Sequence, residues 1–348
     1  EVGHVGIYHL LNNGFYDEGA PNFLKQQTKF PQTRRLLSCD FALQPKLRSL
    51  DADGSDRSYY RVRQGKISRI IMMYGQEKEE NTLFPGIAGF LQKTGINVAH
   101  IYHSDKKHRL VTMEDLGDIS LWKMIQEISD KDQIINIYKR VLDMMVQLHT
   151  KGYRMYCKKP LKISPPFSRK LYLWETEYFK QYFLNRHMKI HWTKRLEKQF
   201  KNVTEFLAQD LSKEKHVLIH RDFQSKNIMM KNNKPYMIDF QGMRLGLAQY
   251  DLASLLYDPY VSSTESMRRH LLDYYISITK EHYRPIDHEH FIEIFQKATV
   301  QRLMQALGAY AFLGYMKGKT DFLNYIPAGV KRLKNALSRL DIQADFLY

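Results

Sequence analysis

The feature that most constrains this chain is a pair of short apolar runs, each of which leads to an aspartate. Residues 217–219 and 236–238 read as buried strands. Asp222 follows the first strand, Asn227 comes five residues later, and Asp239 closes the second strand, seventeen residues after Asp222. A single aspartate at a strand end is often only a turn former. Here the order and the spacing agree at every position, so the pattern indicates a polar site at the strand ends.

This arrangement meets the requirements of phosphoryl transfer from ATP. One carboxylate can receive the proton of an attacking hydroxyl, while an amide oxygen and a second carboxylate can hold magnesium on the phosphates. The turn at residues 231–234, between strand patterns at residues 228–230 and 236–238, reads as a hairpin loop. The pattern therefore predicts a kinase-type catalytic loop.

Composition narrows the class of protein. The chain has 348 residues, of which 43% are hydrophobic and 26% charged, as in globular proteins with ordinary cores. No apolar run approaches the roughly 18–20 residues that a membrane span needs. The first residues lack a signal-peptide pattern. Two cysteines and no zinc-binding motif favour a reducing compartment. We therefore expect a cytoplasmic protein with no membrane partner.

An excess of basic residues leaves two explanations open. The chain has 53 Lys and Arg residues against 37 Asp and Glu residues, a formal charge of +16, and such a charge is typical of nucleic-acid-binding proteins. The basic residues are dispersed in short groups, however, and form no recognisable nucleic-acid motif. We expect a solvated basic surface and no nucleic-acid partner, with a nucleic-acid-binding scaffold as the alternative.

The periodicity divides the chain into a β-rich first part and a helical second part. Strands are predicted at residues 46–50, 58–62, 68–73, 100–103 and 110–114. Helices are predicted at residues 21–37, 78–93, 121–128, 133–149, 170–186, 194–211, 250–257, 267–281, 288–315 and 328–340. The order predicts an α+β fold with a small β-rich N-lobe and a larger, mostly helical C-lobe. We expect a helical extension at residues 1–44, a nucleotide-binding N-lobe at 45–117, and a C-lobe for catalysis and acceptor binding at 118–348.

Four stretches carry a resemblance to a known family, namely residues 54–61, 113–118, 239–241 and 250–256. On these residues the chain resembles the aminoglycoside phosphotransferase/choline kinase superfamily. Within it the chain is most similar to the bacterial N-acetylmuramate/N-acetylglucosamine anomeric kinases. The resemblance implies the bilobal protein-kinase-like fold. It also implies ATP- and Mg²⁺-dependent phosphorylation of the anomeric hydroxyl of an amino sugar, in cell-wall recycling.

The resemblance assigns roles to residues of the catalytic loop. Asp222 would be the catalytic base or the carboxylate that orients the hydroxyl. Asn227 and Asp239 would be the magnesium ligands. Asp251 would brace the loop rather than touch the substrate, because a residue just inside a helix start usually has a structural role.

Two segments are expected to contact the nucleotide. A turn between strands would place backbone amides against the phosphates, although ordinary hairpin turns share its composition. A hinge before the C-lobe would pair with adenine. The third predicted strand lacks the lysine that many kinases keep there, so arginines of the preceding strand would supply the charge, with Glu79 or Glu80 as partner or as part of a solvated helix face. The expected nucleotide contacts are Gly54, Ser55, Asp56, Arg57, Arg61, Glu114, Asp115 and Leu116.

The acceptor is the least constrained part. Trp174 and Glu177 lie in the insertion that lines the acceptor pocket in this family, where Trp174 would stack on a sugar and Glu177 would accept hydroxyl hydrogen bonds. The same aromatic spacing also fits core packing. The basic charge suits an anionic acceptor such as N-acetylmuramate better than a polycation. The alternatives are an aminoglycoside or choline-type hydroxyl kinase and a nucleotide-binding pseudokinase scaffold.

Overall fold

The computed structural model of the protein describes residues 46–50, 57–75, 79–282 and 286–348. These residues form two compact units. The first comprises the described part of Glu1–Gln92 together with Val98–Gly117, and the second comprises Lys93–Asn97 together with the described part of Asp118–Tyr348. The predicted extension at residues 1–44 lies outside the described residues, and so do Gly54, Ser55 and Asp56 of the predicted phosphate loop.

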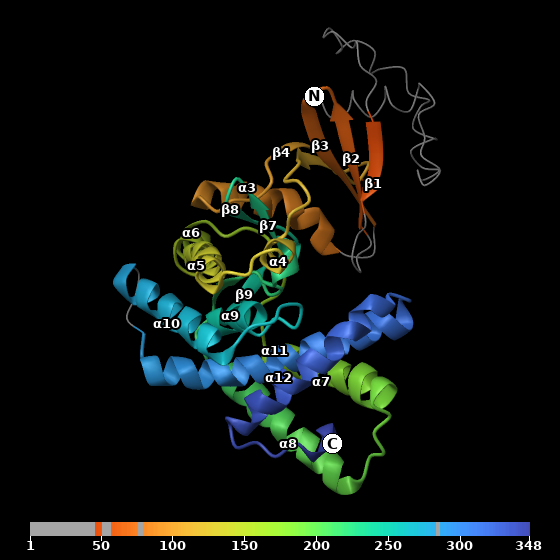
Figure 1. The fold of residues 1–348 in the computed structure, drawn as a ribbon, viewed down its shortest axis with the longest axis vertical. Helices are drawn as coiled ribbons and strands as arrows, with labels where there is room; N and C mark the ends of the chain where they lie inside the picture. The colour runs from red at the N-terminus through yellow and green to blue at the C-terminus, as the bar shows by residue number, and fades with distance from the viewer. Residues whose placement is uncertain (1–45, 51–56, 76–78, 283–285) are drawn as a thin grey trace. The chain divides into compact units, whose positions relative to one another are not determined.

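The first unit is built on a five-stranded antiparallel sheet with the strand order β1-β2-β3-β5-β4 (Figure 1). Tyr60, Ile71 and Leu110, from three adjacent strands, form a buried cluster on it. The sheet confirms the five predicted strands. They are β1 (Lys46–Leu50), β2 (Arg57–Gln64), β3 (Ile67–Tyr74), β4 (Ile101–Asp105) and β5 (Leu110–Glu114).

The helix predicted at residues 78–93 is divided in two. A 3-10 helix, η3 (Glu79–Leu83), precedes α3 (Phe84–Thr94). Pro85 has no backbone N–H to donate, so it fits only in the first turn of a helix and marks a new start. Gly95 follows α3 with a φ of +85°, and a Cβ there would lie 2.8 Å from Nε2 of Gln147. Glycine is therefore required where this helix ends.

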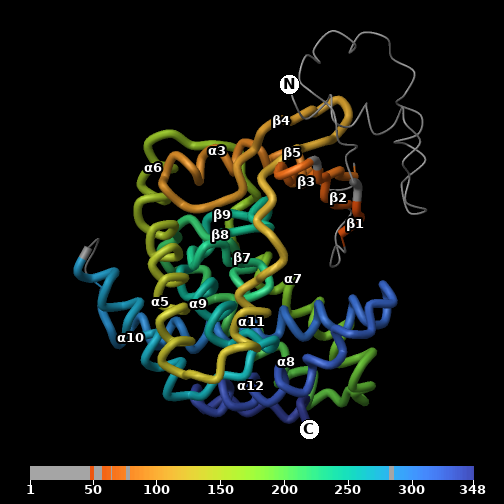
Figure 2. Tube along the Cα trace, turned by 45° about the horizontal axis from the view of Figure 1, so that its top comes forward, coloured from red at the N-terminus to blue at the C-terminus, as the bar shows by residue number. Residues whose placement is uncertain are grey.

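The second unit is mostly helical, and α11 lies at its centre. Residues on nearly all sides of α11 are buried, because it packs against α7, α9 and α12. Another pair, α10 and α5, lies side by side in Figures 1 and 2. The helices are α4 (Leu121–Gln126), α5 (Lys131–Gln147), α6 (Tyr153–Lys158), α7 (Arg169–Phe179), α8 (Lys194–Leu211), α9 (Ala248–Leu256), α10 (Glu265–His282), α11 (His288–Met316) and α12 (Ile326–Ser338).

Two predicted helices continue into wider π-helical turns. The helix predicted at residues 133–149 consists of α5 and the π-helical η4 (Leu148–Gly152). The helix predicted at residues 170–186 consists of α7 and the π-helical η5 (Lys180–His187). Such turns are rare and often lie at functional sites. His149 of η4 and Glu175 of α7, the helix that η5 continues, contribute side chains to the catalytic loop region described below.

Two short antiparallel strand pairs lie within the second unit. β7 (Ile228–Lys231) and β8 (Lys234–Met237) form the predicted hairpin. Asn232 and Asn233 turn it with φ values of 51° and 58°, a left-handed conformation that asparagine tolerates. β6 (Val217–Ile219) pairs with β9 (Arg244–Gly246), which the sequence did not reveal because three residues give no readable alternation.

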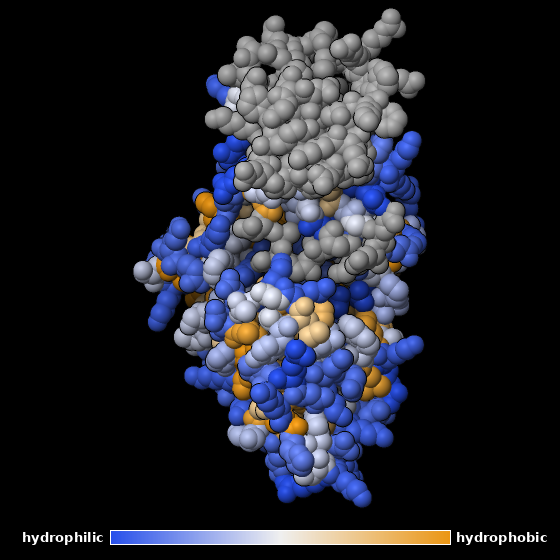
Figure 3. All heavy atoms as spheres, turned by 90° about the vertical axis from the view of Figure 1, so that its right-hand side faces the viewer, coloured by the Kyte–Doolittle hydropathy of each residue, from blue (hydrophilic) through white to orange (hydrophobic). Residues whose placement is uncertain are grey.

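The surface in Figure 3 is mainly hydrophilic, and apolar residues occur on it in small groups. Of the helices in the described part of the chain, none has both the length and the apolar character that a membrane crossing requires. Among the large apolar side chains that are exposed, Trp174 is accessible over 53% of its surface.

Candidate active site

The loop that follows β6 is held from behind by a buried carboxylate. Asp251, in the first turn of α9, is completely buried. Its Oδ2 accepts a hydrogen bond from the backbone N–H of His220 at 2.7 Å, and its Oδ1 accepts one from that of Arg221 at 2.8 Å. His149 of η4 lies 3.1 Å from the same carboxylate. Arg221 has a φ of 81°, which is costly for a residue with a side chain and needs such bracing. The bracing role expected for Asp251 is confirmed.

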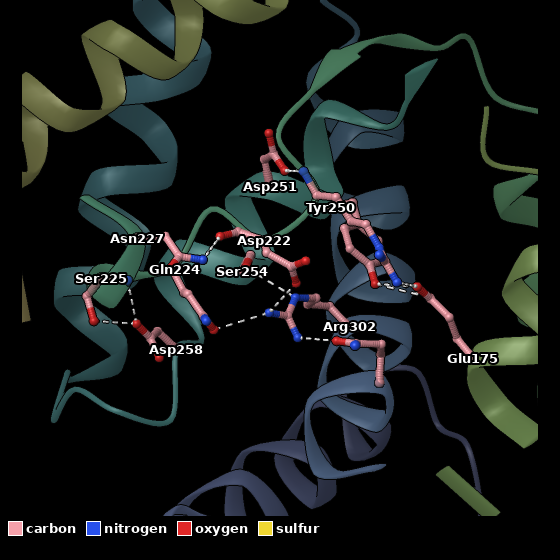
Figure 4. A network of polar contacts seen from close by, with 12 residues as sticks. Glu175, Asp222, Gln224, Ser225, Asn227, Tyr250, Asp251, Ser254, Asp258 and Arg302 are labelled. Carbon is pink, nitrogen blue, oxygen red and sulfur yellow. Dashed lines mark hydrogen bonds and ion pairs between the residues drawn. The ribbon is translucent and has the colours of Figure 1, made fainter. Parts of the chain in front are cut away.

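Hydrogen bonds bring the three predicted catalytic-loop residues together. Nδ2 of Asn227 donates to the backbone oxygen of Asp222 at 3.0 Å (Figure 4). The backbone oxygen of Asn227 accepts from the N–H of Ile238 at 3.1 Å, and Ile238 immediately precedes Asp239. The end of the β7–β8 hairpin is thereby fixed to the loop that carries Asp222.

Asp239 is held in an unusual backbone conformation. Its φ of 61° and ψ of 32° are left-handed, which aspartate tolerates better than most residues. Its Oδ1 accepts a hydrogen bond from Nε2 of the buried Gln241 at 3.0 Å. Gln241 therefore orients the Asp239 carboxylate. Together with the side-chain oxygen of Asn227, this carboxylate gives the hard oxygen donors that Mg²⁺ prefers beside substrate phosphates. The residues fit a magnesium ion.

A buried arginine that the sequence did not reveal reaches the catalytic loop from α11. Nη2 of Arg302 lies 3.4 Å from Oδ1 of Asp222 and 3.4 Å from Oε1 of Gln224. Its Nε donates to Oγ of Ser254 at 3.1 Å (Figure 4). Its Nη1 donates to Oε1 of Gln305 at 2.6 Å. Burial lowers the pKa of Arg302, but Asp222, Tyr250, Tyr310 and Glu175 together more than offset this, and the net pKa is raised. Arg302 is therefore a permanent cation beside Asp222.

A second buried acid lies on α7. Glu175 is fully buried and accepts hydrogen bonds from the hydroxyl of Tyr250, at 3.0 and 3.1 Å, and from Nε2 of Gln301, at 3.2 Å. Nη2 of Arg221 lies 3.7 Å from it. Burial raises the pKa of Glu175, and the charge of Arg221 opposes that shift. This carboxyl joins α7, α9 and α11 behind the loop. Its place on the buried face of α7, with Tyr172, was the signal that could have identified it.

The predicted acceptor residues lie on the outer face of α7. Trp174 and Glu177 are both exposed. The ring of Trp174 stacks on that of Tyr178, with 5.4 Å between centroids and 21° between planes. Tyr178 also contacts Phe312 of α11, at 5.7 Å. Burial raises the pKa of Tyr178, and the nearby charge of Arg221 opposes that shift. Tyr178 is therefore within electrostatic reach of an arginine of the catalytic loop.

In the first unit, two predicted nucleotide contacts are bound to each other. Nε of Arg61 lies 2.8 Å from Oδ2 of Asp115, and its Nη2 donates to Oδ1 at 2.9 Å. Ser68 donates to the same carboxylate at 2.5 Å. Burial raises the pKa of Asp115, but the hydrogen bonds from Ser68 and Arg61 outweigh it and the net pKa is lowered. This pair fixes the chain beyond β5 to the sheet. Arg57, on the same strand as Arg61, is also buried.

The other predicted hinge residues are held at the end of β5. The N–H of Glu114 donates to the oxygen of His100 at 2.8 Å, and Oε2 of Glu114 accepts from the N–H of His100 at 3.2 Å. Leu116 is buried, and Gly117 follows with a φ of 86°. Glu79 and Glu80 lie in the first turn of η3. Glu114 is therefore held in place by contacts within the first unit, and Leu116 by its burial.

Comparison with known proteins places this site in a family. Residues 46–287 match the phosphotransferase enzyme family. The N-acetylmuramate/N-acetylglucosamine kinase of Pseudomonas aeruginosa is 23% identical over 290 residues, covering 83% of this chain and 82% of that protein. The protein of that name from Neisseria meningitidis serogroup B is 25% identical over 293 residues, covering 83% and 84%. The structure of Plasmodium vivax ethanolamine kinase superposes with a TM-score of 0.57 at 15% identity, covering 96% of this chain and 88% of that one.

These likenesses confirm the predicted fold class, an α+β protein-kinase-like fold with a β-rich first part and a helical second part. They also confirm the predicted resemblance, since the family match spans more than half of the chain. The chain therefore belongs to the phosphotransferase enzyme family and is an enzyme that transfers a phosphoryl group to a hydroxyl group.

Proposed function

We propose that this enzyme uses ATP and Mg²⁺ to phosphorylate the anomeric hydroxyl of an amino sugar, N-acetylmuramate or N-acetylglucosamine, in cell-wall recycling in the cytoplasm. The observation that carries the proposal is that two relatives named N-acetylmuramate/N-acetylglucosamine kinase align with more than four-fifths of the chain. The aligned part includes Asp222, Asn227 and Asp239, which the structure draws together.

The charges around Asp222 support a neutral or anionic acceptor. Arg302 lies 3.4 Å from the Asp222 carboxylate, and Arg221 precedes it in the chain. The carboxyl of Glu175 is already engaged by Tyr250 and Gln301. A polycationic aminoglycoside would meet two guanidinium groups here, whereas a neutral or carboxylate-bearing sugar would not be repelled. The charge balance therefore favours the amino sugar over the aminoglycoside alternative.

The exposed face of α7 supports the acceptor assignment of Trp174 and Glu177. An aromatic ring with one open face suits the apolar face of a sugar, and a carboxylate suits its hydroxyls. Trp174 is supported from behind by Tyr178, which keeps its ring in one orientation. In this proposal Trp174 stacks on the acceptor and Glu177 accepts its hydroxyl hydrogen bonds.

Asp222 carries the proton transfer. Its carboxylate accepts the proton of the acceptor hydroxyl while the hydroxyl oxygen forms a bond to the γ-phosphorus of ATP. The bond between that phosphorus and the oxygen bridging to the β-phosphate breaks, and ADP leaves with the bonding electron pair. The product is a sugar 1-phosphate. Arg302 and the backbone tie to Asn227 hold Asp222 in place for this step.

Asn227 and Asp239 would hold the magnesium ion, which when bound neutralises the charge of the phosphates. Nδ2 of Asn227 is used in the bond to Asp222, so its Oδ1 is the atom assigned to the metal. Gln241 steadies one oxygen of Asp239.

Nucleotide binding is assigned to residues 45–117. Backbone groups of Glu114, Asp115 and Leu116 would pair with adenine, and Gly54, Ser55 and Asp56 would meet the phosphates. Arg57 and Arg61, both on β2, are the candidates for the phosphate-binding cation that replaces the third-strand lysine, and Arg61 also pairs with Asp115.

The decisive experiment measures ADP release with Mg²⁺ and ATP against N-acetylmuramate, N-acetylglucosamine, other hexoses, choline, ethanolamine and aminoglycosides. NMR of the product identifies the phosphorylated position. We expect turnover on an amino sugar and a 1-phosphate product. Turnover confined to choline, ethanolamine or an aminoglycoside would overturn the acceptor assignment and leave the enzyme class intact. The Asp222→Asn variant serves as the control for contaminating kinases.

A further inference from the structure

Four aromatic rings from distant parts of the chain surround a single lysine of the catalytic loop. Lys226 belongs to η6 (Ser225–Asn227), one residue before Asn227. Its ammonium nitrogen lies 4.3 Å from the ring centroid of Tyr260, 5.0 Å from Tyr325, 5.2 Å from Trp122 and 5.4 Å from Phe322. All four distances are within the range of cation–π attraction, and several rings around one ammonium are the usual protein site for such a group.

The four rings are fixed in position by contacts of their own. Nε1 of Trp122 donates to the backbone oxygen of Tyr260 at 3.1 Å. The rings of Tyr260 and Tyr325 meet edge to face, with 4.5 Å between centroids. Tyr310 of α11 supports Tyr260, Phe322 and Tyr325 from behind at centroid distances of 5.5 to 6.0 Å. The rings thus form a preorganised cage, which we call the Lys226 cage (Trp122, Tyr260, Phe322 and Tyr325).

Asp258 links Tyr260 of the cage to Ser225, the residue that precedes Lys226. Oδ2 of Asp258 accepts hydrogen bonds from the backbone N–H and the hydroxyl of Ser225, at 2.8 and 2.6 Å. Its Oδ1 accepts from the N–H of Tyr260 at 3.0 Å. Asp258 is buried, and Figure 4 shows its contact with Ser225. The η6 turn is therefore anchored to the cage on one side of Lys226 and to Asp222, through Asn227, on the other.

We propose that the Lys226 cage is an ammonium-binding site whose occupant is the chain's own Lys226, and that this capture positions Asn227. Lys226 acts as a positioning residue that pins the η6 turn, so that the Asn227 side chain has one orientation. The part that concerns metal binding by Asn227 rests on the function proposed above. The occupied cage also leaves no room there for the ammonium group of a choline-like acceptor.

The test removes most of the lysine side chain and then adds a small ammonium compound that can replace the missing atoms. Lys226→Ala deletes the atoms from Cγ to Nζ, and propylammonium supplies three carbons and an ammonium group in their place. We expect kcat to fall by about tenfold or more, the Mg²⁺ concentration for half-maximal rate to rise, and KM for the acceptor to change little. Propylammonium should restore the rate with saturation, whereas 1-propanol and NaCl at equal concentration should not.

Two further variants separate charge from bulk and position. Lys226→Met keeps the length of the side chain but removes its charge, and it should lose activity as Lys226→Ala does. Lys234→Ala, at the exposed start of β8, removes a lysine outside the cage and should behave as the unmodified protein. A folded Lys226→Met variant with unchanged rate and Mg²⁺ dependence would overturn the positioning role.

Binding to the cage has its own readout, independent of any acceptor. The chain has three tryptophans, so Trp174→Phe and Trp192→Phe leave Trp122 as the only one. In that background, propylammonium should change the fluorescence of Lys226→Ala with saturation and should raise its melting temperature. Replacing Phe322 by Leu should weaken this response. A folded Lys226→Ala protein without a saturable response would refute the cage. If the unmodified protein turned over no acceptor, the proposed function would fail, while this titration would still decide about the cage.

Discussion

Asp222 is the residue on which the proposed chemistry depends most directly. Replacing it by asparagine keeps its size but removes the group that accepts the proton. We expect kcat to fall by about 10²–10⁴-fold, with nucleotide affinity little changed, because the carboxylate acts on the acceptor hydroxyl. Steady-state kinetics and nucleotide titration measure both quantities. The same change at the exposed Asp132 of α5 should have no effect, and a fully active Asp222→Asn enzyme would refute the assignment.

Asp239 should show a different kinetic signature from Asp222. Its carboxylate is assigned to the metal, so Asp239→Ala should lower kcat and also weaken binding of the magnesium-nucleotide. Calorimetric titration with ATP, with and without Mg²⁺, separates the two effects. Gln241→Ala, which removes the hydrogen bond that orients Asp239, should give a weaker form of the same defect. Unchanged magnesium-nucleotide affinity in Asp239→Ala would contradict the metal assignment.

Arg302 is expected to contribute both to the reaction rate and to the stability of the fold. Arg302→Met would leave the Asp222 carboxylate and the Ser254 hydroxyl without this buried partner. We expect kcat to fall and the free energy of unfolding to drop by about 1–3 kcal/mol, since removing one partner of a partly buried ion pair leaves its hydrogen-bonding groups unsatisfied. Lys at this position should restore part of both. Arg195→Met is the matched control, because Arg195 pairs with Asp345 on the surface and its replacement should leave the stability almost unchanged. Equal effects of the two substitutions, measured by denaturant titration, would contradict this role.

Site residues that lie near one another in the sequence could be predicted from it. Site residues that come together only in the folded chain could not. Asp222, Asn227 and Asp239 share one loop and hairpin, so their spacing carried the prediction. Arg302 is 80 residues away from Asp222 and lies on a helix whose sequence reads as core. On α7 the prediction selected Trp174 and Glu177 and overlooked Glu175, although Glu175 is the acid that the structure buries. Helical periodicity indicates which face of a helix is buried, but it does not indicate which polar groups of other elements that face will contact.

At the scale of elements, the crossing of α7 and α11 depends on one glycine. A Cβ on Gly308 would lie 2.9 Å from Cδ1 of Tyr178 and 3.0 Å from the backbone Cα of Phe179. Gly308→Ala should therefore push the helices apart and lower the free energy of unfolding by about 1–3 kcal/mol. Gly89→Ala, in α3, is the control, because a Cβ there meets nothing within 4 Å. That change should stabilise by about 0.5–1 kcal/mol through helix propensity. Denaturant titration of both variants measures the contrast, and a neutral Gly308→Ala would contradict the close packing.

The Glu175 carboxyl should make the packing of α7, α9 and α11 depend on pH. Burial raises its pKa, so the folded state holds this proton to higher pH than the unfolded chain does. Between the ordinary glutamate pKa of about 4 and the raised value, the folded state binds more protons, and stability falls as pH rises. Glu175→Gln should remove that slope. Melting temperatures from pH 4 to 8 measure it, with the exposed Glu177→Gln as control, and an unchanged slope in Glu175→Gln would contradict the buried acid.

Element boundaries diverged from prediction where local chemistry interrupted a periodic pattern. The helix expected at residues 78–93 broke because Pro85 requires a new first turn. The helix expected at residues 170–186 kept its direction but widened into η5, a change of hydrogen-bond pattern that hydrophobic periodicity does not record. β9 escaped notice because it exists only through its pairing with β6. The longest helix, α11, was predicted almost to the residue, since its apolar pattern is long and continuous.

At the scale of the whole molecule, the charge of +16 sets how the enzyme meets polyanions. A dispersed basic surface attracts nucleic acid weakly and without specificity, through counterion release that salt suppresses. We expect a random single-stranded DNA to bind at about 20 mM KCl and to dissociate at about 150 mM, a range in which the Debye length shortens to about 8 Å. Fluorescence anisotropy measures this binding, and DNA at the higher salt should not inhibit phosphoryl transfer. A specific nucleic-acid site would still bind DNA at the higher salt. That result would give the chain a nucleic-acid-binding role in addition to its enzymatic role. Loss of binding with full activity retained would instead assign the charge to solvation and to attraction of anionic substrates.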